Sequence, residues 1–96
     1  MARGSYPVAS NYLLLTGSGT TQQVTGRCSL LFVHIENVGT TATLDIYDAT
    51  SGTTLKVFEW VSADGKGRFD IGIRMTLGLR VIVGGTTPRI VIGYEE

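Results

Sequence analysis

Apolar and polar residues alternate along much of this chain with a period of two. Over residues 42–47, Ala, Leu and Ile take turns with Thr, Asp and Tyr, and similar alternation runs through 69–75, 77–83 and 90–94. Successive side chains of a β-strand lie on opposite faces, so these stretches predict strands with one face toward the core. Apolar residues at helical spacing do not persist for three turns, so we expect no helix longer than two turns.

Breaks rich in Gly, Asp, Ser, Thr or Pro separate the runs, at residues 16–19, 38–41, 48–52, 64–67 and 84–88. The break at 48–52 predicts a tight hairpin loop, after which residues 53–61 return antiparallel. Weaker strands are expected at 11–15 and 20–24. Seven or eight strands at a spacing of about ten residues predict one antiparallel, jelly-roll-like β-sandwich over residues 11–96. Residues 1–10 are expected to form a flexible N-terminal arm.

Residues 27–36 are almost continuously apolar. Such a pattern is typical of a strand covered on both faces, so this strand is expected to be central or to lie at an interface. Phe32 and His34 are therefore candidate interface residues. The arm contributes Tyr6 as another candidate.

The amino-acid composition agrees with an all-β domain that can associate with other protein chains. Thr, Val and Ile make up about three residues in ten of the 96, which favours strands. Eight basic and eight acidic residues give zero formal charge, which argues against nucleic-acid binding and offers little resistance to self-association. No apolar run has the length of a signal peptide or a membrane span, so we expect a soluble protein made in the cytoplasm.

Candidates for chemistry are few. Cys28 and His34 are the one cysteine and the one histidine, and six residues of strand would separate them by about 20 Å, too far for a catalytic dyad. They also cannot supply a zinc site, whereas Asp48 and Asp64 either cap turns or contribute to a calcium loop. We favour turn capping, and expect no enzyme activity, no cofactor and no metal.

Phe58 and Trp60 allow two interpretations. They share a strand face with Lys56 in an ideal alternation, opposite Leu55 and Val57. If the Leu55 face is buried, the two aromatic side chains are exposed and can stack on a sugar or anchor an interface. If the strand is inverted, they form the core.

Arginines complete the candidate interface. Arg74 and Arg80 lie in predicted strands, and we expect them to pair with acids across strands or across an interface, where arginine is enriched.

The C-terminal third resembles small virion proteins of tailed bacteriophages. The resemblance is carried by residues 69–86 (FDIGIRMTLGLRVIVGGT) and 90–95 (IVIGYE), and extends more loosely back to Leu31 through 37–39 and 42–48. It implies a compact β-sandwich, often a jelly roll, with a structural role and no catalytic residues. Such proteins sit as trimers on the capsid as decoration or cement proteins, or belong to tails or head fibres.

From this resemblance we expect a capsid decoration protein at the virion surface, made in the host cytoplasm. Its partner would be the major capsid protein or another virion protein, and it would form a homo-oligomer, preferably a trimer, without binding nucleic acid or membrane. The alternative is a glycan- or receptor-binding module of a tail or head fibre that uses Phe58 and Trp60.

Overall fold

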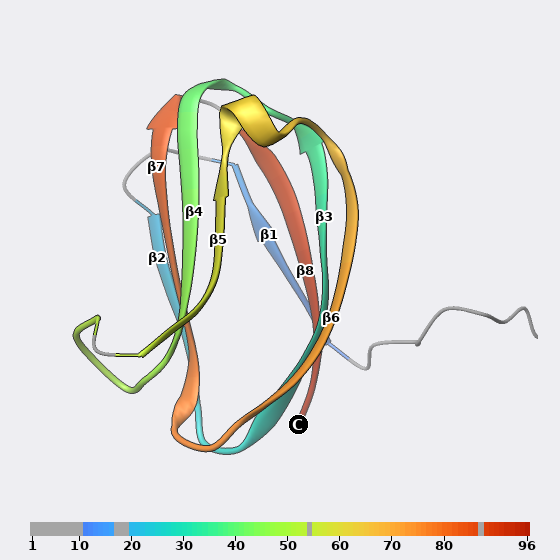
Figure 1. The fold of residues 1–96 in the computed structure, drawn as a ribbon. Coiled ribbons are helices and arrows are strands. Elements are labelled where there is room, and N and C mark those ends of the chain that lie inside the picture. The colour runs from blue at the N-terminus through green and yellow to red at the C-terminus, as the bar shows by residue number, and fades with distance from the viewer. Residues whose placement is uncertain (1–10, 17–19, 54, 87) are drawn as a thin grey trace, which may run out of the picture.

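The computed structural model describes residues 11–16, 20–53, 55–86 and 88–96. The prediction of an all-β sandwich is confirmed, because the strands of this part form two four-stranded antiparallel sheets packed face to face (Figure 1). The predicted arm over residues 1–10, with Tyr6, lies outside the described residues. The strands are β1 (Asn11–Leu15), β2 (Thr20–Thr25), β3 (Cys28–Asn37), β4 (Thr40–Asp48), β5 (Lys56–Val61), β6 (Gly67–Met75), β7 (Gly78–Thr86) and β8 (Arg89–Glu95), with a short 3-10 helix at Ser62–Asp64.

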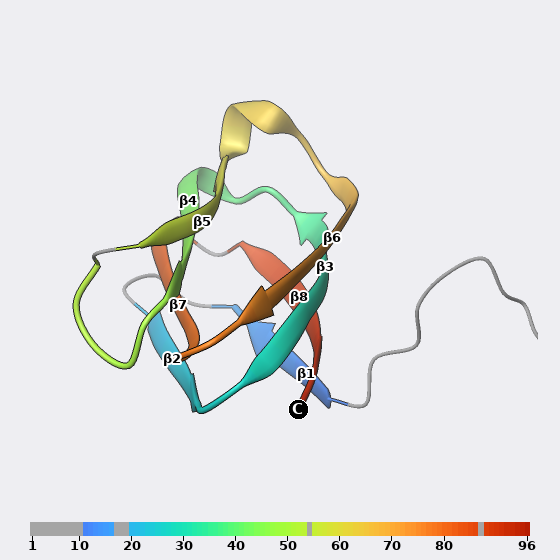
Figure 2. The same cartoon turned by 60° about the horizontal axis from the view of Figure 1, so that its bottom comes forward.

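The strand order is that of a jelly roll. Sheet A has the order β1-β8-β3-β6 and sheet B the order β2-β7-β4-β5 (Figure 2). Strands pair from the two ends of the chain inward, β1 with β8, β2 with β7, β3 with β6 and β4 with β5. The chain is thus one long antiparallel ribbon, rolled so that β3 also pairs with β8 and β4 with β7.

The core lies between the two sheets and takes one face of each strand. The predicted alternation in β4 is confirmed, because Ala42, Leu44 and Ile46 are buried. The remaining fully buried large side chains come from both sheets: Leu15, Leu30, Val33, Ile35, Trp60, Met75, Leu79, Val81, Ile90 and Ile92. The aliphatic side chains among them offer no hydrogen-bond partners to the backbone, so the N–H and C=O groups of neighbouring strands bond to one another in the sheet ladders.

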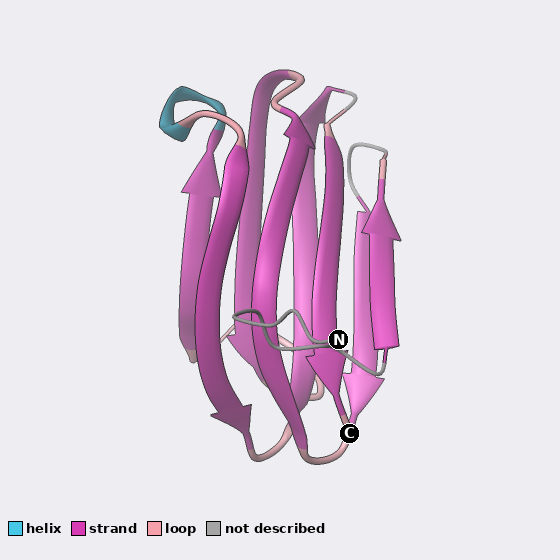
Figure 3. Ribbon diagram, turned by 90° about the vertical axis from the view of Figure 1, so that its right-hand side faces the viewer, coloured by secondary structure: helices cyan, strands magenta, loops and turns pink. Residues whose placement is uncertain are grey.

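The strands run along the length of the sandwich, with the short 3-10 helix at one end (Figure 3). Strand β3 lies between β8 and β6, and its continuous apolar run reflects a β-bulge. Leu30 pairs with Tyr94, but Phe32 already pairs with Gly93, so Leu31 is an extra residue against β8. The bulge reverses the alternation: Leu30 and Val33 face the core, whereas Phe32 lies on the outer face.

The link between β4 and β5 differs from the predicted tight hairpin. Strand β4 ends at Asp48 and β5 begins only at Lys56, with the Asp48 N–H donating to the Leu55 carbonyl at 2.9 Å. The Asp48 side chain faces inward and makes its hydrogen bonds to a different turn, so it does not cap a tight turn of its own.

The Asp48 carboxylate caps the turn between β6 and β7, where the chain passes from sheet A to sheet B. Its oxygens accept hydrogen bonds from the backbone N–H groups of Thr76 (3.0 Å), Leu77 (2.8 Å) and Gly78 (3.2 Å). The Thr76 hydroxyl donates a fourth at 3.1 Å. Burial raises the pKa of Asp48, but these donors outweigh burial and hold the pKa below its ordinary value. The interaction joins segments 28 to 30 residues apart.

We expect Asp48→Ala to lower the free energy of unfolding at pH 7 by about 3 kcal/mol, because three backbone donors lose their partner at a largely buried position. Urea denaturation followed by circular dichroism measures this change. Asp70→Ala is the matched control, because Asp70 is exposed and we expect a change below about 1 kcal/mol. Equal effects of the two substitutions would contradict the structural role of Asp48.

Acid should remove the same stabilisation. A folded-state pKa below the unfolded value of about 3.9 means that the contribution is complete above that pH and is lost as the pH falls through the folded value. The free energy of unfolding should therefore fall more steeply below about pH 4 in the unmodified protein than in Asp48→Ala.

Candidate functional site: the outer face of sheet A

Trp60 and Phe58 belong to the core side of β5, which decides between the two interpretations of this strand. Trp60 is only 1% exposed, and its indole Nε1 donates to the Gly65 carbonyl at 2.9 Å. Phe58 is partly buried and packs against Phe69 with ring centroids 6.0 Å apart. A buried Trp60 has no surface to offer to a sugar or a partner, so we do not carry it into the candidate site.

Lys56 does not share the face of Phe58 and Trp60, so that part of the strand pattern was wrong. The pairing of β4 with β5 shifts between Ile46 and Tyr47, and Lys56 pairs with Tyr47 on the outer face of sheet B. There its ammonium lies 3.2 Å from Asp45 Oδ1. One extra residue in β5 is sufficient to move Lys56 to the other face.

Cys28 and His34 lie on opposite faces of β3. The Cys28 side chain is fully buried, and its pKa is raised by burial and, to a smaller extent, by the nearby charges of Asp48 and Glu96. His34 lies on the outer face, across from Arg68 of β6. The bulge between them breaks the alternation that would otherwise place them on one face, so they form no dyad.

The acidic candidates act as hydrogen-bond acceptors. Asp64 Oδ2 accepts from the Val61 N–H at 3.1 Å, and Asp48 caps the turn described above. Within residues 11–16, 20–53, 55–86 and 88–96, no three His, Cys, Asp or Glu side chains gather as metal ligands, and no pocket is present. The described part also has no helix with the length and apolar character needed to cross a membrane.

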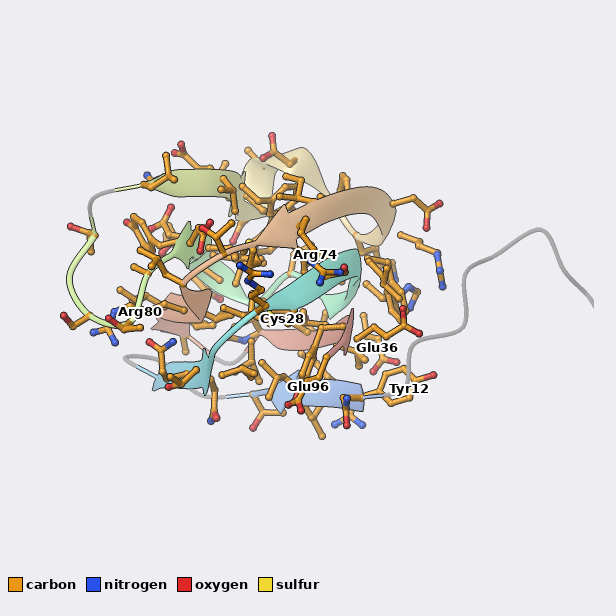
Figure 4. The ribbon with its side chains drawn as sticks, turned by 90° about the horizontal axis from the view of Figure 1, so that it is seen from below. Tyr12, Cys28, Glu36, Arg74, Arg80 and Glu96 are labelled. Carbon is orange, nitrogen blue, oxygen red and sulfur yellow. The ribbon has the colours of Figure 1, made fainter. Side chains whose placement is uncertain are left out.

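The two candidate arginines lie on different sheets. Arg74 extends from the outer face of sheet A, where its Nη1 donates to Ser29 Oγ at 3.4 Å. Arg80 lies on sheet B, and its Nη1 donates to Gln23 Oε1 at 3.2 Å. In Figure 4, Arg80 is far from Tyr12 of β1. Of the predicted interface residues, Phe32, His34 and Arg74 therefore share one surface, the outer face of sheet A.

The centre of that surface is a cluster that we name the aromatic shelf: Tyr12, Phe32, Arg68 and Gly93. Phe32 lies over Gly93, where a Cβ atom would come within 2.2 Å of its ring. The Arg68 guanidinium carbon lies 3.9 Å from the centroid of the Phe32 ring, which is a cation–π geometry. The Tyr12 ring packs beside Phe32 at 6.2 Å between centroids, tilted by 58°.

The shelf is built by strand register. Tyr12 and Phe32 are both paired with Gly93, one from β1 and the other from β3, so the missing side chain of β8 leaves room for both rings. Asp70 lies opposite Phe32 on β6 and accepts from Arg68 Nε at 2.8 Å, which holds the guanidinium over the ring. Residues from all four strands of sheet A thus converge.

Strand β1 gives this surface its exposed apolar area. Tyr12 is 57% exposed and Leu14 is 52% exposed, and both lie on the outer side of β1. The other large apolar side chains exposed in the described chain, Leu55 and Leu77, lie outside the strands. Sequence reasoning expected Arg68, like Arg74, Arg80 and Arg89, to pair with acids across strands or across an interface, but it did not connect Arg68 with Phe32. It missed Tyr12 and Gly93, because only the register of four strands brings these residues to Phe32.

A comparison of the chain with protein-family models and with curated proteins finds no match. The candidate site therefore rests on its own geometry.

We expect Gly93→Ala to lower the free energy of unfolding by about 1–3 kcal/mol, because the new methyl group collides with Phe32. In a Phe32→Ala background the same substitution should cost less than about 0.5 kcal/mol, since Ala suits a strand better than Gly once the ring is gone. A double-mutant cycle from urea denaturation measures the coupling. Equal costs in both backgrounds would show that Phe32 does not lie on Gly93.

Proposed function

We propose that this protein is a non-enzymatic structural protein of a bacteriophage virion, a capsid decoration or cement protein that stabilises the shell by protein–protein contacts. The observation that carries the proposal is the pair of exposed apolar side chains Tyr12 and Leu14 on the outer face of sheet A, where the Tyr12 ring packs on the buried Phe32 of the aromatic shelf. The jelly roll is compatible, since it is common among viral capsid proteins and lectins. A fold alone does not give a function, so the resemblance of residues 69–86 and 90–95 to phage virion proteins supplies the biological context.

The outer face of sheet A has the composition of a protein-binding surface. Tyr12 and Leu14 form an exposed apolar centre, which the buried Phe32 ring supports from below, and such centres with Tyr and Arg contribute most of the affinity in protein interfaces. The ion pair of Arg89 with Glu36 lies at one end of it, and Asp70 on β6 pairs with Arg68 of the shelf. A polar rim around an apolar centre is the usual anatomy of an interface.

Zero net charge suits a protein that is present in many copies on one particle. Eight positive and eight negative side chains give neighbouring copies little long-range repulsion. We place the protein on the capsid surface, with the major capsid protein or another virion protein as its partner. The phage resemblance favours a trimer as its oligomeric state.

A glycan-binding role in a tail or head fibre remains the alternative. The buried Trp60 cannot serve it, but Tyr12 is an exposed ring of the kind that stacks on sugars. The two functions differ in what the protein binds through this surface, a capsid shell or an oligosaccharide.

We expect purified protein to co-sediment with capsid shells that lack it, and to saturate at a copy number per shell that fits icosahedral symmetry. Tyr12→Ala should weaken this binding by at least about tenfold, as expected for a central aromatic contact. Leu77→Ala is the matched control, because Leu77 is equally exposed but lies in the turn after β6. Intact shells that bind no protein, together with a glycan that binds through Tyr12, would replace the capsid function with the alternative.

A further inference from the structure

Phe32 is covered on the outer face of sheet A by residues from the other three strands. Side chains on an outer face point away from the core, yet Phe32 is only 6% exposed. Gly93 lies beneath its ring, the Arg68 guanidinium carbon lies 3.9 Å from the ring centroid, and the Tyr12 ring packs beside it. The Phe32 ring is thus a fixed support for Tyr12, which is itself 57% exposed.

The position of the Arg68 guanidinium depends on Asp70. The two residues lie two apart in β6, on its outer face, and Arg68 Nε donates to Asp70 Oδ1 at 2.8 Å. Asp70 is directly opposite Phe32 in the register, so the ion pair lies beside the ring. A surface ion pair contributes little to stability. This one instead fixes the direction of an arginine side chain that otherwise has many rotamers.

We propose that Asp70 and Arg68 are positioning residues for partner binding at Tyr12. Asp70 holds the guanidinium over Phe32, and the covered Phe32 ring holds Tyr12 in one rotamer before the partner arrives. A side chain that is already ordered loses less entropy when it is bound, so this order strengthens binding without a new contact. The inference rests on the proposed function, and it adds that affinity depends on residues that need not touch the partner.

Leu14, the other exposed apolar side chain of β1, is supported by a different row of the sheet. It is opposite Val91 of β8, and Val91 is in turn opposite His34 of β3. The ion pair of Arg68 with Asp70 therefore bears on Tyr12 and not on Leu14. This difference gives the proposal an internal control.

The rotamers of Tyr12 in the free protein test the positioning without any partner. NMR three-bond couplings of Tyr12 measure its χ1 populations. We expect one dominant rotamer in the unmodified protein and in Asp70→Glu, which keeps the carboxylate. Asp70→Ala and Arg68→Ala should each give a mixture of rotamers, because the Phe32 ring loses its cover.

Asp45→Ala is the matched control for these couplings. It removes the carboxylate of another ion pair, with Lys56 at 3.2 Å on the outer face of sheet B, and should leave the Tyr12 couplings unchanged. Circular dichroism verifies that all variants fold. Equal Tyr12 populations in Asp70→Ala and in the unmodified protein would overturn the positioning.

Binding to capsid shells that lack the protein tests the consequence for affinity. Asp70→Ala should raise the dissociation constant by about three- to tenfold, the scale of ordering one interface side chain. In a Tyr12→Ala background the same substitution should change the constant by less than about twofold, whereas in a Leu14→Ala background the full loss should remain. Asp70→Glu should bind as the unmodified protein does.

The binding cycle separates positioning from direct contact. A full loss from Asp70→Ala in the Tyr12→Ala background would show that Asp70 touches the partner itself, which overturns the positioning. Binding that Tyr12→Ala weakens and Asp70→Ala leaves unchanged also overturns the positioning, but not the capsid function. Intact shells that bind no protein overturn the capsid function, and the Tyr12 couplings then still decide whether Asp70 positions the ring.

Discussion

The Asp48 carboxylate makes the interaction on which the rest of this fold depends. It satisfies three backbone donors of the turn where the chain leaves β6 in sheet A and enters β7 in sheet B. Strand β7 then lies between β2 and β4, so fixing its start fixes the interior of sheet B. A largely buried carboxylate is stable there because its hydrogen bonds compensate for its lost hydration. These hydrogen bonds thereby help to hold the ribbon in its rolled form.

The sequence predicted most of the strands because a period of two is a local signal. Strands β1 and β3 begin and end within one residue of the expected limits, and β4 alternates as expected. What could not be predicted depends on partners distant along the chain. The bulge at Leu31 and the shift beside Lys56 change the face of nearby residues. The apolar run around Leu31 is also typical of a strand covered on both faces, so the run alone does not identify the bulge. Asp48 was expected to cap the loop that begins with it, but the turn that it caps begins 28 residues away.

The candidate site shows the same limit. Phe32, His34 and Arg74 were expected at an interface, and the structure brings these three to one outer face. The residues that organise this face are Gly93 and Arg68, and the sequence pattern places neither of them beside Phe32. Their role follows only from the register, in which a missing side chain on β8 accommodates the Phe32 ring and β6 supplies a cation above it. The same packing supports Tyr12 beside an uncharged edge strand.

In the proposed function the protein acts by binding other proteins. The turn at Asp48 maintains the fold, and the outer face of sheet A contacts the neighbouring virion proteins. A cryo-EM reconstruction of capsid shells saturated with the protein tests this most directly. The account predicts that the exposed Tyr12 and Leu14 lie against another virion protein in the reconstruction. An outer face of sheet A open to solvent, with sheet B or the loops seated on the shell, would contradict it.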